Sequence, residues 1–547
     1  MRIKSLDMLE TAGPRLDAIE RRIDGYEPRL DLPYRGSLLE RTRRLPAFAN
    51  TRPNAVPSQA LSSPILRSCS ATGMLGHSGI SRRCVRLCFA VMAVLLGVFM
   101  ASFAASAAEF KPPIVLESPF PEQEGWFGQS VSTVPDVNGD GRPEILICAG
   151  GGARSAYLYD GVSRQMIMEL TGGWGLGIDD DNGDGRGDVI VSADVRVFDV
   201  LDGTNGSVIY TLEPAETFNT EVRRVSAIPD LNGDSRPEIA IALATFGSNP
   251  EPRVVKIYDG ASGTELRSLS GAGLGSAFGE SVSGIPDVNG DGRGDVIVGA
   301  PLGNRAYIYD GATGALLRTL GGSGQFGRSV VGLNDVNGDG RGDVVVTAIE
   351  SRRAYIYDGA NGTRLQTLNA PGNPAYFGWM LNRLPDINGD GRDDVVVGPP
   401  HAPNAPQSPG NVYLFSGVTG ELLATLPGHA IGGSVIGVPD LNGDGLGEVL
   451  VANPRANSTS GIYQAGQVLL YLSKARPPRP MAIGWGPEGF KLRLTGQGVV
   501  KFELQRSEDL INWAPIATQM HTNQTTEFVD TDAKNASRRF YRTRTAQ

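Results

Sequence analysis

Residues Asp287-Val-Asn-Gly-Asp-Gly-Arg-Gly-Asp295 form a stretch in which acidic and amide side chains are interleaved with glycine. Nearly the same nine residues begin again at Asp136, Asp335 and Asp386, and looser copies begin at Asp180, Asp230 and Asp440. The seven starts are 44, 50, 57, 48, 51 and 54 residues apart along the chain. A period near 50 with seven members is typical of propellers and solenoids, so this repeat decides the fold.

Each copy of the nine-residue loop lies in the same frame of short strands. A Phe-Gly pair stands upstream, with its Phe nine residues before the first Asp, as at Phe278 and Phe326. An aliphatic triplet such as Val296-Ile-Val298 follows the loop, and then an alternating strand and turn such as Ala306-Tyr-Ile-Tyr-Asp-Gly311. A last strand of the type Leu316-Leu-Arg-Thr-Leu320 completes the unit. Four short strands separated by Gly or Asp turns indicate one propeller blade.

The two ends of the array complement each other. After the seventh loop, the strand Val468-Leu-Leu-Tyr-Leu472 leads into a Pro-rich stretch, and no fourth strand follows. Before the first loop stands an additional apolar segment, Ile114-Val-Leu116. We expect this segment to supply the outer strand of the last blade, because closing the ring removes the exposed edges of an open array. The sequence thus predicts an all-β fold with a seven-bladed β-propeller over residues 109–475.

The loop pattern D-x-N-G-D-G-x-x-D/E carries side-chain oxygens at positions 1, 3, 5 and 9. Hard oxygen ligands at this spacing suit Ca²⁺, and a divalent ion relieves the repulsion between clustered carboxylates. The alternative is a metal-free polar turn, but all seven copies keep the four oxygen positions, so we expect up to seven Ca²⁺ ions. The expected ligands are Asp136, Asn138, Asp140, Glu144; Asp180, Asn182, Asp184, Asp188; Asp230, Asn232, Asp234, Glu238; Asp287, Asn289, Asp291, Asp295; Asp335, Asn337, Asp339, Asp343; Asp386, Asn388, Asp390, Asp394; and Asp440, Asn442, Asp444, Glu448.

The Phe-Gly pair, the acidic loop and the Gly-Ala-Pro at Gly299–Pro301 together resemble the FG-GAP repeat of the integrin α-subunit β-propeller. The resemblance covers about residues 113–475. It implies Ca²⁺ binding on one face of the ring, at the hairpin between the first two strands of each blade. Three repeats depart from the Phe-Gly pattern, with Trp174-Gly175, Phe218-Asn219 and Gly432-Gly433. No gap between repeats could hold an inserted ligand-binding domain, so the resemblance supports the fold and calcium binding more than cell adhesion.

The tripeptide Arg-Gly-Asp, an integrin-recognition sequence, ends at Asp188, Asp295 and Asp343. Each of these Asp residues is also position 9 of a loop, where its carboxylate is expected to be committed to the cation. We therefore do not expect adhesion through these tripeptides.

The segment before the repeats has the features of a secretory signal peptide. Residues 87–108 contain no charged side chain, follow three arginines and end in Ala105-Ser-Ala107, which fits a peptidase cleavage site. We expect a cleaved signal peptide over residues 74–108. The alternative is a transmembrane anchor, so a membrane is an expected partner only if the segment 87–108 is not cleaved.

The position of this signal within the chain leads to a second expectation. Roughly 80 residues precede the apolar run, and Met74 lies just upstream of its arginines. We expect translation to begin at Met74 and residues 1–73 to be an over-extended, disordered N-terminus. The protein is expected to be secreted or at the cell surface, in the extracellular space or periplasm of a bacterium.

The chain's charge divides at the same boundary. The 547 residues include 50 Lys and Arg and 59 Asp and Glu, a net charge of −9. Residues 1–108 have a net charge of +7 and residues 109–547 a net charge of −16. A net acidic chain is a poor candidate for nucleic-acid binding. The loops supply 21 of the 51 acidic residues after residue 108, so much of this acidity is interpreted as ligand charge.

The C-terminal part has its own pattern. Residues 476–481 are Pro-rich and predict a stiff linker. Apolar and polar residues then alternate in 490–494, 499–504, 527–529 and 539–543. This pattern predicts a small antiparallel β-sandwich over residues 482–547. The stretch Glu503–Trp513 and the later Arg539-Phe-Tyr-Arg542 resemble fibronectin-III-like terminal modules, which serve as binding or sorting appendages; the alternative is a stabilising domain.

The leading functional interpretation is a calcium-binding platform for adhesion to, or binding of, an unknown glycan or surface protein. The alternative is a calcium-dependent lyase or hydrolase of polysaccharides on the same scaffold. His401, His429 and His521 belong to no recognisable catalytic arrangement, so no catalytic residue is assigned and an enzyme is less favoured. An enzyme on this scaffold would need one catalytic site that differs from the equivalent positions of the other repeats. The second and third repeats and the insert 400–410 are where such an exception is expected.

Overall fold

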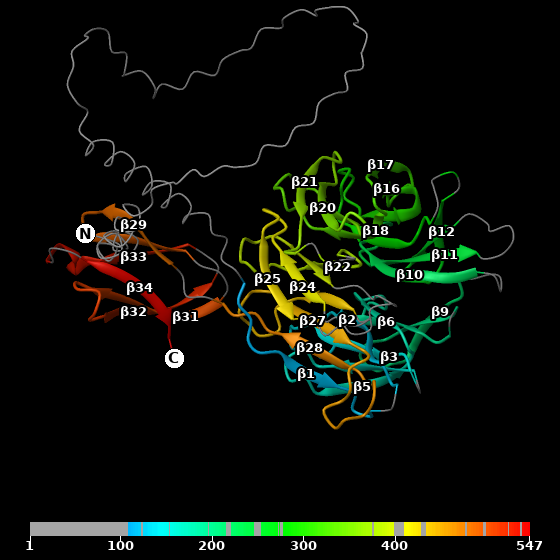
Figure 1. Ribbon diagram of the computed structural model, residues 1–547, viewed down its shortest axis with the longest axis horizontal. Helices are drawn as coiled ribbons and strands as arrows, with labels where there is room; N and C mark the ends of the chain where they lie inside the picture. The colour runs from blue at the N-terminus through cyan, green and yellow to red at the C-terminus, as the bar shows by residue number, and fades with distance from the viewer. Residues whose placement is uncertain are drawn as a thin grey trace, which may run out of the picture. The chain divides into compact units, whose positions relative to one another are not determined.

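The computed structural model describes residues 108–547 with short gaps (Figure 1). The gaps are residues 122–123, 152–153, 195, 215–219, 246–252, 272, 274–276, 373, 375–376, 399–409, 428–433, 476–478, 496–498, 523–524, 536–538 and 547. The expected extension 1–73, the signal segment up to residue 107 and nearly all of the insert 400–410 therefore lie outside the described residues. Within the described ranges, no helix combines the length and apolar character needed to cross a bilayer.

Four-stranded antiparallel sheets fill the described part of the chain between residues 114 and 471. Three of them are β2 (Phe127–Val134), β3 (Glu144–Ala149), β4 (Ser155–Tyr159), β5 (Met166–Thr171); β6 (Gly175–Ile178), β7 (Asp188–Ser192), β8 (Phe198–Leu201), β9 (Val208–Leu212); and β10 (Thr220–Ile228), β11 (Glu238–Thr245), β12 (Val254–Asp259), β13 (Glu265–Ser270). The next two are β14 (Ser281–Ile285), β15 (Asp295–Ala300), β16 (Arg305–Asp310), β17 (Leu316–Gly321); and β18 (Phe326–Leu333), β19 (Asp343–Ala348), β20 (Arg353–Asp358), β21 (Arg364–Leu368). The last two are β22 (Met380–Leu384), β23 (Asp394–Gly398), β24 (Asn411–Phe415), β25 (Leu422–Pro427); and β26 (Val435–Val438), β27 (Glu448–Asn453), β28 (Gln467–Tyr471) with β1 (Ile114–Glu117). Four strands per repeat are thus confirmed, and a short 3₁₀ helix, η1 (Pro301–Gly303), follows β15.

Strand β1 completes the sheet that ends the array. The strand order of this sheet is β1-β28-β27-β26, and β1 pairs antiparallel with β28, with Ile114 opposite Leu470 and Leu116 opposite Val468. The prediction that the N-terminal segment is the outer strand of the last sheet is confirmed. The first strands contact one another in the series β2, β6, β10, β14, β18, β22, β26, and β26 contacts β2 again. This succession of sheets is that of a β-propeller (Figure 1).

The second strand of each sheet is its most buried element. All six residues of β15 and all six of β19 are buried, including the aliphatic triplets that follow the acidic loops. β-Branched side chains fit a strand that is covered on both faces. The fourth strands, such as β17, leave most of their side chains partly or fully exposed. The repeated aliphatic triplets therefore mark the middle of each sheet and not its rim.

The Phe-Gly pair anchors the start of each first strand. Phe326 is fully buried, and its ring lies 6.1 Å from that of Tyr355 and 6.0 Å from that of Tyr357. Gly327 has a φ of +91°, and a Cβ there would lie 2.1 Å from the carbonyl oxygen of Arg305, so no larger residue fits. The strand tyrosines therefore pack against the Phe of the Phe-Gly pair.

The C-terminal part contains two three-stranded sheets. One has the order β29 (Arg479–Trp485), β30 (Phe490–Thr495), β33 (Thr526–Asp530), and the other β32 (Ala514–Thr522), β31 (Val499–Ser507), β34 (Phe540–Thr545); a 3₁₀ helix, η2 (Thr531–Asn535), follows β33. Both sheets contribute to one hydrophobic cluster, for example through Leu492, Phe502 and Tyr541. Strand β29 begins three residues before the expected boundary at 482. It is an edge strand, a position that tolerates Pro480.

Candidate metal centres

The seven acidic loops all connect the first strand of a sheet to its second strand. The loop Asp136–Glu144 joins β2 to β3, and the loop Asp440–Glu448 joins β26 to β27. The first strands follow one another around the propeller, so the loops lie at the same end of their sheets. This is the hairpin at which the resemblance places Ca²⁺.

The side chains at positions 1, 3 and 5 are held by the backbone of their own loop. In the first loop, Asp136 Oδ1 accepts the N–H of Gly139 at 2.6 Å and its Oδ2 that of Gly141 at 3.1 Å. Asn138 Oδ1 accepts the N–H of Asp140 at 2.9 Å. Both glycines have φ above +80°, which favours glycine over any other residue. The sequence pattern therefore shapes the loop before any ion binds.

The carboxylate at position 9 begins the second strand and is fully buried in every loop. These residues are Glu144, Asp188, Glu238, Asp295, Asp343, Asp394 and Glu448. Burial raises the pKa of Glu144 and of Glu238 to about 7, and the carboxylates at positions 1 and 5 add repulsion. The same causes raise the pKa of Glu448 to about 9. A buried carboxylate among other carboxylates is an environment that a divalent cation stabilises.

Asp and Glu at position 9 make different hydrogen bonds. Asp295 accepts the N–H of Val288 at 2.7 Å with Oδ2 and that of Gly311 at 2.9 Å with Oδ1, so both of its oxygens have backbone donors. Glu144 and Glu238 each use Oε2 to accept the position-2 N–H, while their buried Oε1 atoms have no partner among the described residues. In these two loops the longer Glu side chain therefore leaves one oxygen available to a ligand, whereas Glu448 Oε1 accepts hydrogen bonds from Asn442 at 2.6 Å and Ser473 at 3.2 Å.

The three loops that end in Glu bring their carboxylates together. One oxygen from each member of the sets Asp136, Asp140, Glu144; Asp230, Asp234, Glu238; and Asp440, Asp444, Glu448 lies within 4.8 Å of the others. Oxygen ligands converging at this spacing fit a hard cation such as Ca²⁺. Ligation by the residues of the four Asp loops, and by the Asn at position 3 of every loop, stays a prediction.

A further acidic residue reaches the loop from the hairpin between the third and fourth strands of the sheet. Asn138 Nδ2 donates to Asp160 Oδ2 at 2.6 Å, and Asn232 Nδ2 donates to Asp259 Oδ2 at 2.9 Å. Both Asp residues come from the Asp-Gly turn after the third strand, which our reading of the sequence treated only as a turn. The signal was present, because Asp-Gly recurs there in five of the seven repeats.

Arginine at position 7 joins each loop to the preceding one, which the sequence analysis missed. Arg186 lies 2.9 Å from Asp136, Arg341 2.9 Å from Asp287, and Arg392 2.9 Å from Asp335. Arg293 lies 3.7 Å from Asp230, and Arg142 of the first loop lies 3.0 Å from Asp440 of the seventh. Arg236 instead donates to the carbonyl oxygen of Asp181.

The seventh loop breaks this pattern, because a buried Leu446 stands at its position 7. The preceding loop's Asp386 has a pKa raised by burial. The pKa of Asp287 is instead held below its ordinary value: burial raises it, but the amides of Gly290 and Gly292 and the charge of Arg341 outweigh that. The charge of Arg341 is thus one of the causes that lower the pKa of Asp287, and Asp386 has no corresponding arginine from the next loop.

The Arg-Gly-Asp tripeptides are built into these contacts. Asp188, Asp295 and Asp343 are fully buried, and Arg186 and Arg341 lie against the neighbouring loops. None of the three can be presented to a receptor as a free tripeptide in this fold.

The second repeat holds an acidic residue that its pattern does not require. Position 2 is aliphatic in the other six loops but is Asp181 here. This residue is fully buried, and Tyr210 donates to its Oδ2 at 3.1 Å. Burial, with repulsion from Asp188, raises the pKa of Asp181 to about 8. Asp181 is thus a further departure of the second repeat, which the sequence analysis did not single out.

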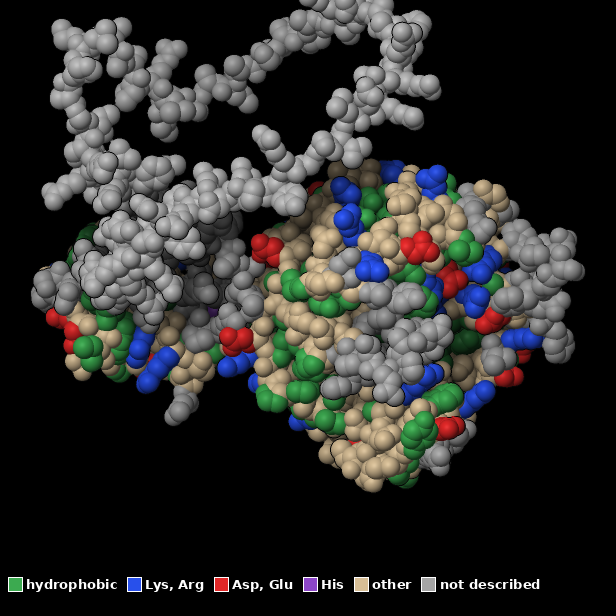
Figure 2. All heavy atoms as spheres, in the orientation of Figure 1, with side chains coloured by type: hydrophobic (Ala, Val, Ile, Leu, Met, Phe, Trp, Pro, Cys, Tyr) green, Lys and Arg blue, Asp and Glu red, His purple; other side chains and the backbone are tan. Residues whose placement is uncertain are grey.

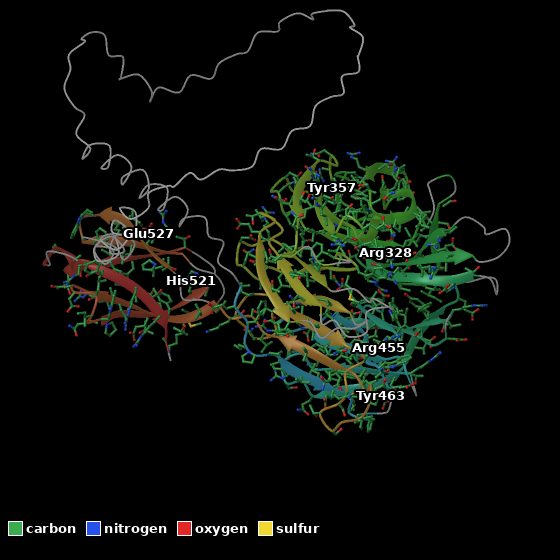
Figure 3. All side chains as sticks on the ribbon, viewed as in Figure 1. Arg328, Tyr357, Arg455, Tyr463, His521 and Glu527 are labelled. Carbon is green, nitrogen blue, oxygen red and sulfur yellow. The ribbon has the colours of Figure 1, made fainter. Side chains whose placement is uncertain are left out.

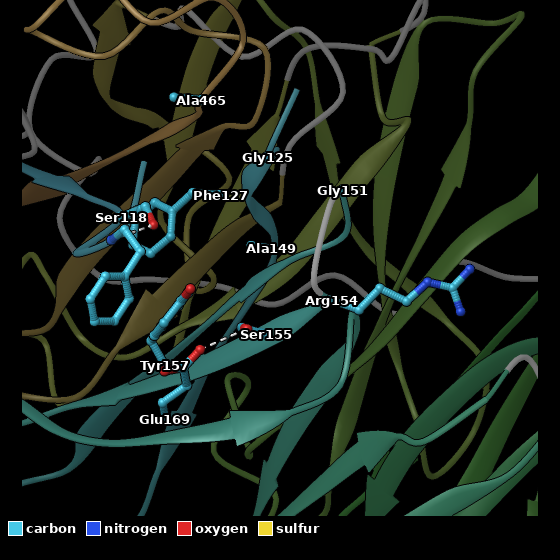
Figure 4. Close-up of a pocket in the computed structure, with 11 residues that line it drawn as sticks. Ser118, Gly125, Phe127, Ala149, Gly151, Arg154, Ser155, Tyr157, Glu169 and Ala465 are labelled. Atoms are coloured by element: carbon cyan, nitrogen blue, oxygen red, sulfur yellow. Dashed lines mark hydrogen bonds between the residues drawn. The ribbon is translucent and has the colours of Figure 1, made fainter. Parts of the chain in front are cut away.

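A pocket of about 410 Å³ lies where the first and last sheets meet (Figure 4). Phe127, Tyr157 and the exposed Phe120 contribute to its wall. Ser155 donates to Glu169 at 2.8 Å, and the side chain of Arg154 extends away from this pair (Figure 4). The wall contains no histidine. His521, the His within the described residues, is buried on β32 of the C-terminal sheets.

Comparisons with known proteins agree with this architecture. The family model of the FG-GAP repeat matches residues 127–161, 278–317 and 432–471, and that of the FG-GAP-like repeat matches 335–397 and 386–451. Mouse integrin alpha-8 is 31% identical over 143 residues, which are 22% of this chain and 13% of that protein. Mouse integrin alpha-IIb is 31% identical over 142 residues, 22% of this chain and 13% of that protein. Chicken integrin alpha-V is 27% identical over 219 residues, 34% of this chain and 21% of that protein. The matches thus span only 13% to 21% of the length of these relatives.

Proposed function

Since the chain is an FG-GAP-repeat protein with an integrin α-like β-propeller, we propose that it is a secreted, calcium-stabilised binding platform. In this proposal the seven sheets are the blades of one closed propeller, and the two C-terminal sheets form a small β-sandwich appended to it. The ligand is a glycan or a surface protein. The repeated architecture supports a binding role, because it supplies a rigid ring whose loops vary without altering the scaffold.

One observation carries the calcium part of the proposal. Three carboxylates converge in each Glu loop, and in two of these loops a buried Glu oxygen has no protein donor. A buried, unpartnered oxygen is costly, and a cation at that position removes the cost. We propose that all seven loops bind Ca²⁺ and that the three Glu loops bind it most tightly.

Calcium titration of the metal-free protein tests whether the three Glu loops bind Ca²⁺ more tightly than the four Asp loops. We expect about three tight sites and a weaker set, and we expect chelation to lower the melting temperature, since Ca²⁺ binds only the folded loops. Glu144→Gln should remove one tight site. The matched variant Asp295→Asn should leave the number of tight sites unchanged, because Asp295 already bonds two backbone amides. A melting temperature unaffected by chelator would contradict the calcium proposal.

The alternative function is a calcium-dependent polysaccharide lyase or hydrolase. The wall of the pocket in Figure 4 supports it only through Arg154 and Glu169, the charged residues there. Incubation with a panel of polysaccharides, scored for new reducing or unsaturated ends, decides between the two. We expect calcium-dependent binding without product. Release of a product would establish the enzyme instead.

A further inference from the structure

One position of the repeat varies although the glycine before it is kept in six of the seven repeats. It follows the Phe-Gly pair and begins the first strand, at the end of the sheet opposite the acidic loop. In the six repeats whose pair ends in glycine, this position holds Gln129, Leu176, Glu280, Arg328, Trp379 and Ser434. The first strands contact one another in series, so these side chains lie at the inner end of adjacent sheets. At this position, repeats with the same fold carry side chains of different charge and polarity.

Charged side chains from three adjacent sheets meet at this position, and an aromatic side chain joins them from a fourth. Glu280 accepts hydrogen bonds from Arg328 of the next sheet and, at 3.0 Å, from Arg253. The guanidinium of Arg328 also lies 4.2 Å from the ring centroid of Trp379. Figure 3 labels Arg328 in the interior of the propeller view, away from its rim. The ion pair and the aromatic ring hold this arginine in a fixed orientation.

Positive charge exceeds negative charge in the cluster. Arg223 and Arg224 enter it from β10, and Arg223 lies 3.6 Å from Glu221. Arg224 is exposed, donates to the carbonyl oxygen of Arg223, and forms no ion pair with a carboxylate in the described ranges. Arg224 is open to solvent, yet the surrounding protein and the charge of Arg328 lower its pKa below the ordinary value of 12.5. Among the described residues, this cluster thus contains four guanidinium groups and the carboxylates of Glu221 and Glu280.

We propose that Arg223, Arg224, Arg253 and Arg328, arranged around Glu280, bind the carboxylate of a uronate residue in an acidic glycan. Guanidinium groups recognise carboxylates through paired, charge-assisted hydrogen bonds. The ring of Trp379 beside Arg328 offers an apolar surface for the sugar ring next to its carboxylate. The proposal rests on the platform function above and names its ligand class.

The charge of the whole protein favours spaced carboxylates over a dense polyanion. Residues 109–547 carry a net charge of −16, which repels a polyanion at long range. Figure 2 shows basic side chains mixed with acidic ones over the sheet of β10 to β13, without an extended basic surface. A local cluster of this kind recognises one or two carboxylates, as in a saccharide whose uronate residues alternate with neutral sugars.

Calorimetric titration of the calcium-loaded protein with uronate oligosaccharides tests the proposal. The probes are tetrasaccharides of hyaluronan, unsulfated chondroitin, alginate and polygalacturonate. At least one should bind, and its carboxyl-reduced, neutral derivative should not. Arg224→Ala should weaken binding roughly tenfold to a hundredfold, as the loss of a hydrogen bond to a charged group does. Arg455→Ala is the matched control, because Arg455 is exposed on another sheet (Figure 3).

Three outcomes would overturn the inference: no binding of any uronate, equal binding of the neutral derivative, or equal loss in Arg455→Ala. Preferential binding of an aspartate-rich peptide would assign the cluster to a protein ligand and also overturn it. Measuring the melting temperature with and without calcium distinguishes failure of the uronate proposal from failure of the platform proposal. If calcium still stabilises Arg224→Ala while uronate binding is lost, both proposals stand; if calcium has no effect on the unmodified protein, the platform proposal fails by itself.

Discussion

At the residue scale, the length of one side chain divides the acidic loops. Asp at position 9 reaches two backbone amides, as Asp295 does, and both of its oxygens are thereby bonded. Glu is one methylene longer, and in Glu144 and Glu238 this places Oε1 where the described residues offer no donor. Two residues with the same charge therefore present different atoms to a cation. A sequence pattern that allows either Asp or Glu at position 9 does not reveal this difference in hydrogen bonding.

Asp181 gives a pH-dependent prediction for the metal-free protein. Its pKa is about 8 in the folded state, against an ordinary value of 3.8, so the folded protein keeps a proton that the unfolded chain releases between these values. The free energy of unfolding contributed by this group therefore falls as the pH rises from about 4 to 8. Asp181→Asn removes the titrating group and should stabilise the protein more at pH 8 than at pH 5.

Urea unfolding in chelator at both pH values measures this effect. Asp181→Leu, which restores the residue type of other repeats, should show the same trend without the hydrogen bond from Tyr210. An equal stability change at pH 5 and pH 8 in both variants would show that Asp181 does not titrate in this range.

At the element scale, β1 joins the two ends of the repeat array. It pairs with β28 in the last sheet, and Leu116 is buried in the cluster shared by the first and last sheets. Arg142, which contacts Asp440, links the same two sheets at the loop end. Closure is therefore made by a strand, by apolar packing and by an ion pair.

Leu116→Ala should destabilise the propeller by about 2–4 kcal/mol, because it leaves a cavity in a buried cluster. Val115 is the control: it lies in the same strand but is 46% exposed, so Val115→Ala should cost less than about 1 kcal/mol. Denaturant unfolding of the two variants measures the difference. Equal losses of stability would mean that β1 contributes through its backbone pairing alone.

At the scale of the whole molecule, two sets of sheets bury separate cores. The cluster around Phe490, Phe502 and Tyr541 contains only C-terminal residues, and the clusters of the four-stranded sheets contain none of them. The acidic loops all belong to the four-stranded sheets. We therefore expect any stability that depends on calcium to be confined to the four-stranded sheets.

We predict two unfolding transitions in differential scanning calorimetry. Chelator should lower the midpoint of the larger transition, which belongs to the four-stranded sheets, and leave the smaller one in place. A variant ending at residue 475 should retain only the larger, calcium-dependent transition. A single transition that moves as a whole with calcium would contradict the independence of the two cores.

Most of the architecture could be predicted from the sequence because each repeat carries its own local instructions. The glycines of the loop, the aliphatic triplet and the Phe-Gly pair act within one sheet, and β1 was recognisable as the strand missing from the last repeat. In the C-terminal part, β32 was not predicted, since its sequence Ala514–Thr522 lacks a clean alternation. Its pairing with β31 supplies the order that its own pattern does not.

The sequence by itself determined the repeat, the four strands of each unit and the loop oxygens, because these depend on residues within about fifty positions of one another. Only the tertiary structure decided which oxygens remain without donors, how each arginine meets the preceding loop, and that Arg224, Arg328 and Glu280 share one cluster. Those contacts join different sheets, and their distances follow from how neighbouring sheets pack in the ring. A pattern read along one repeat does not contain them.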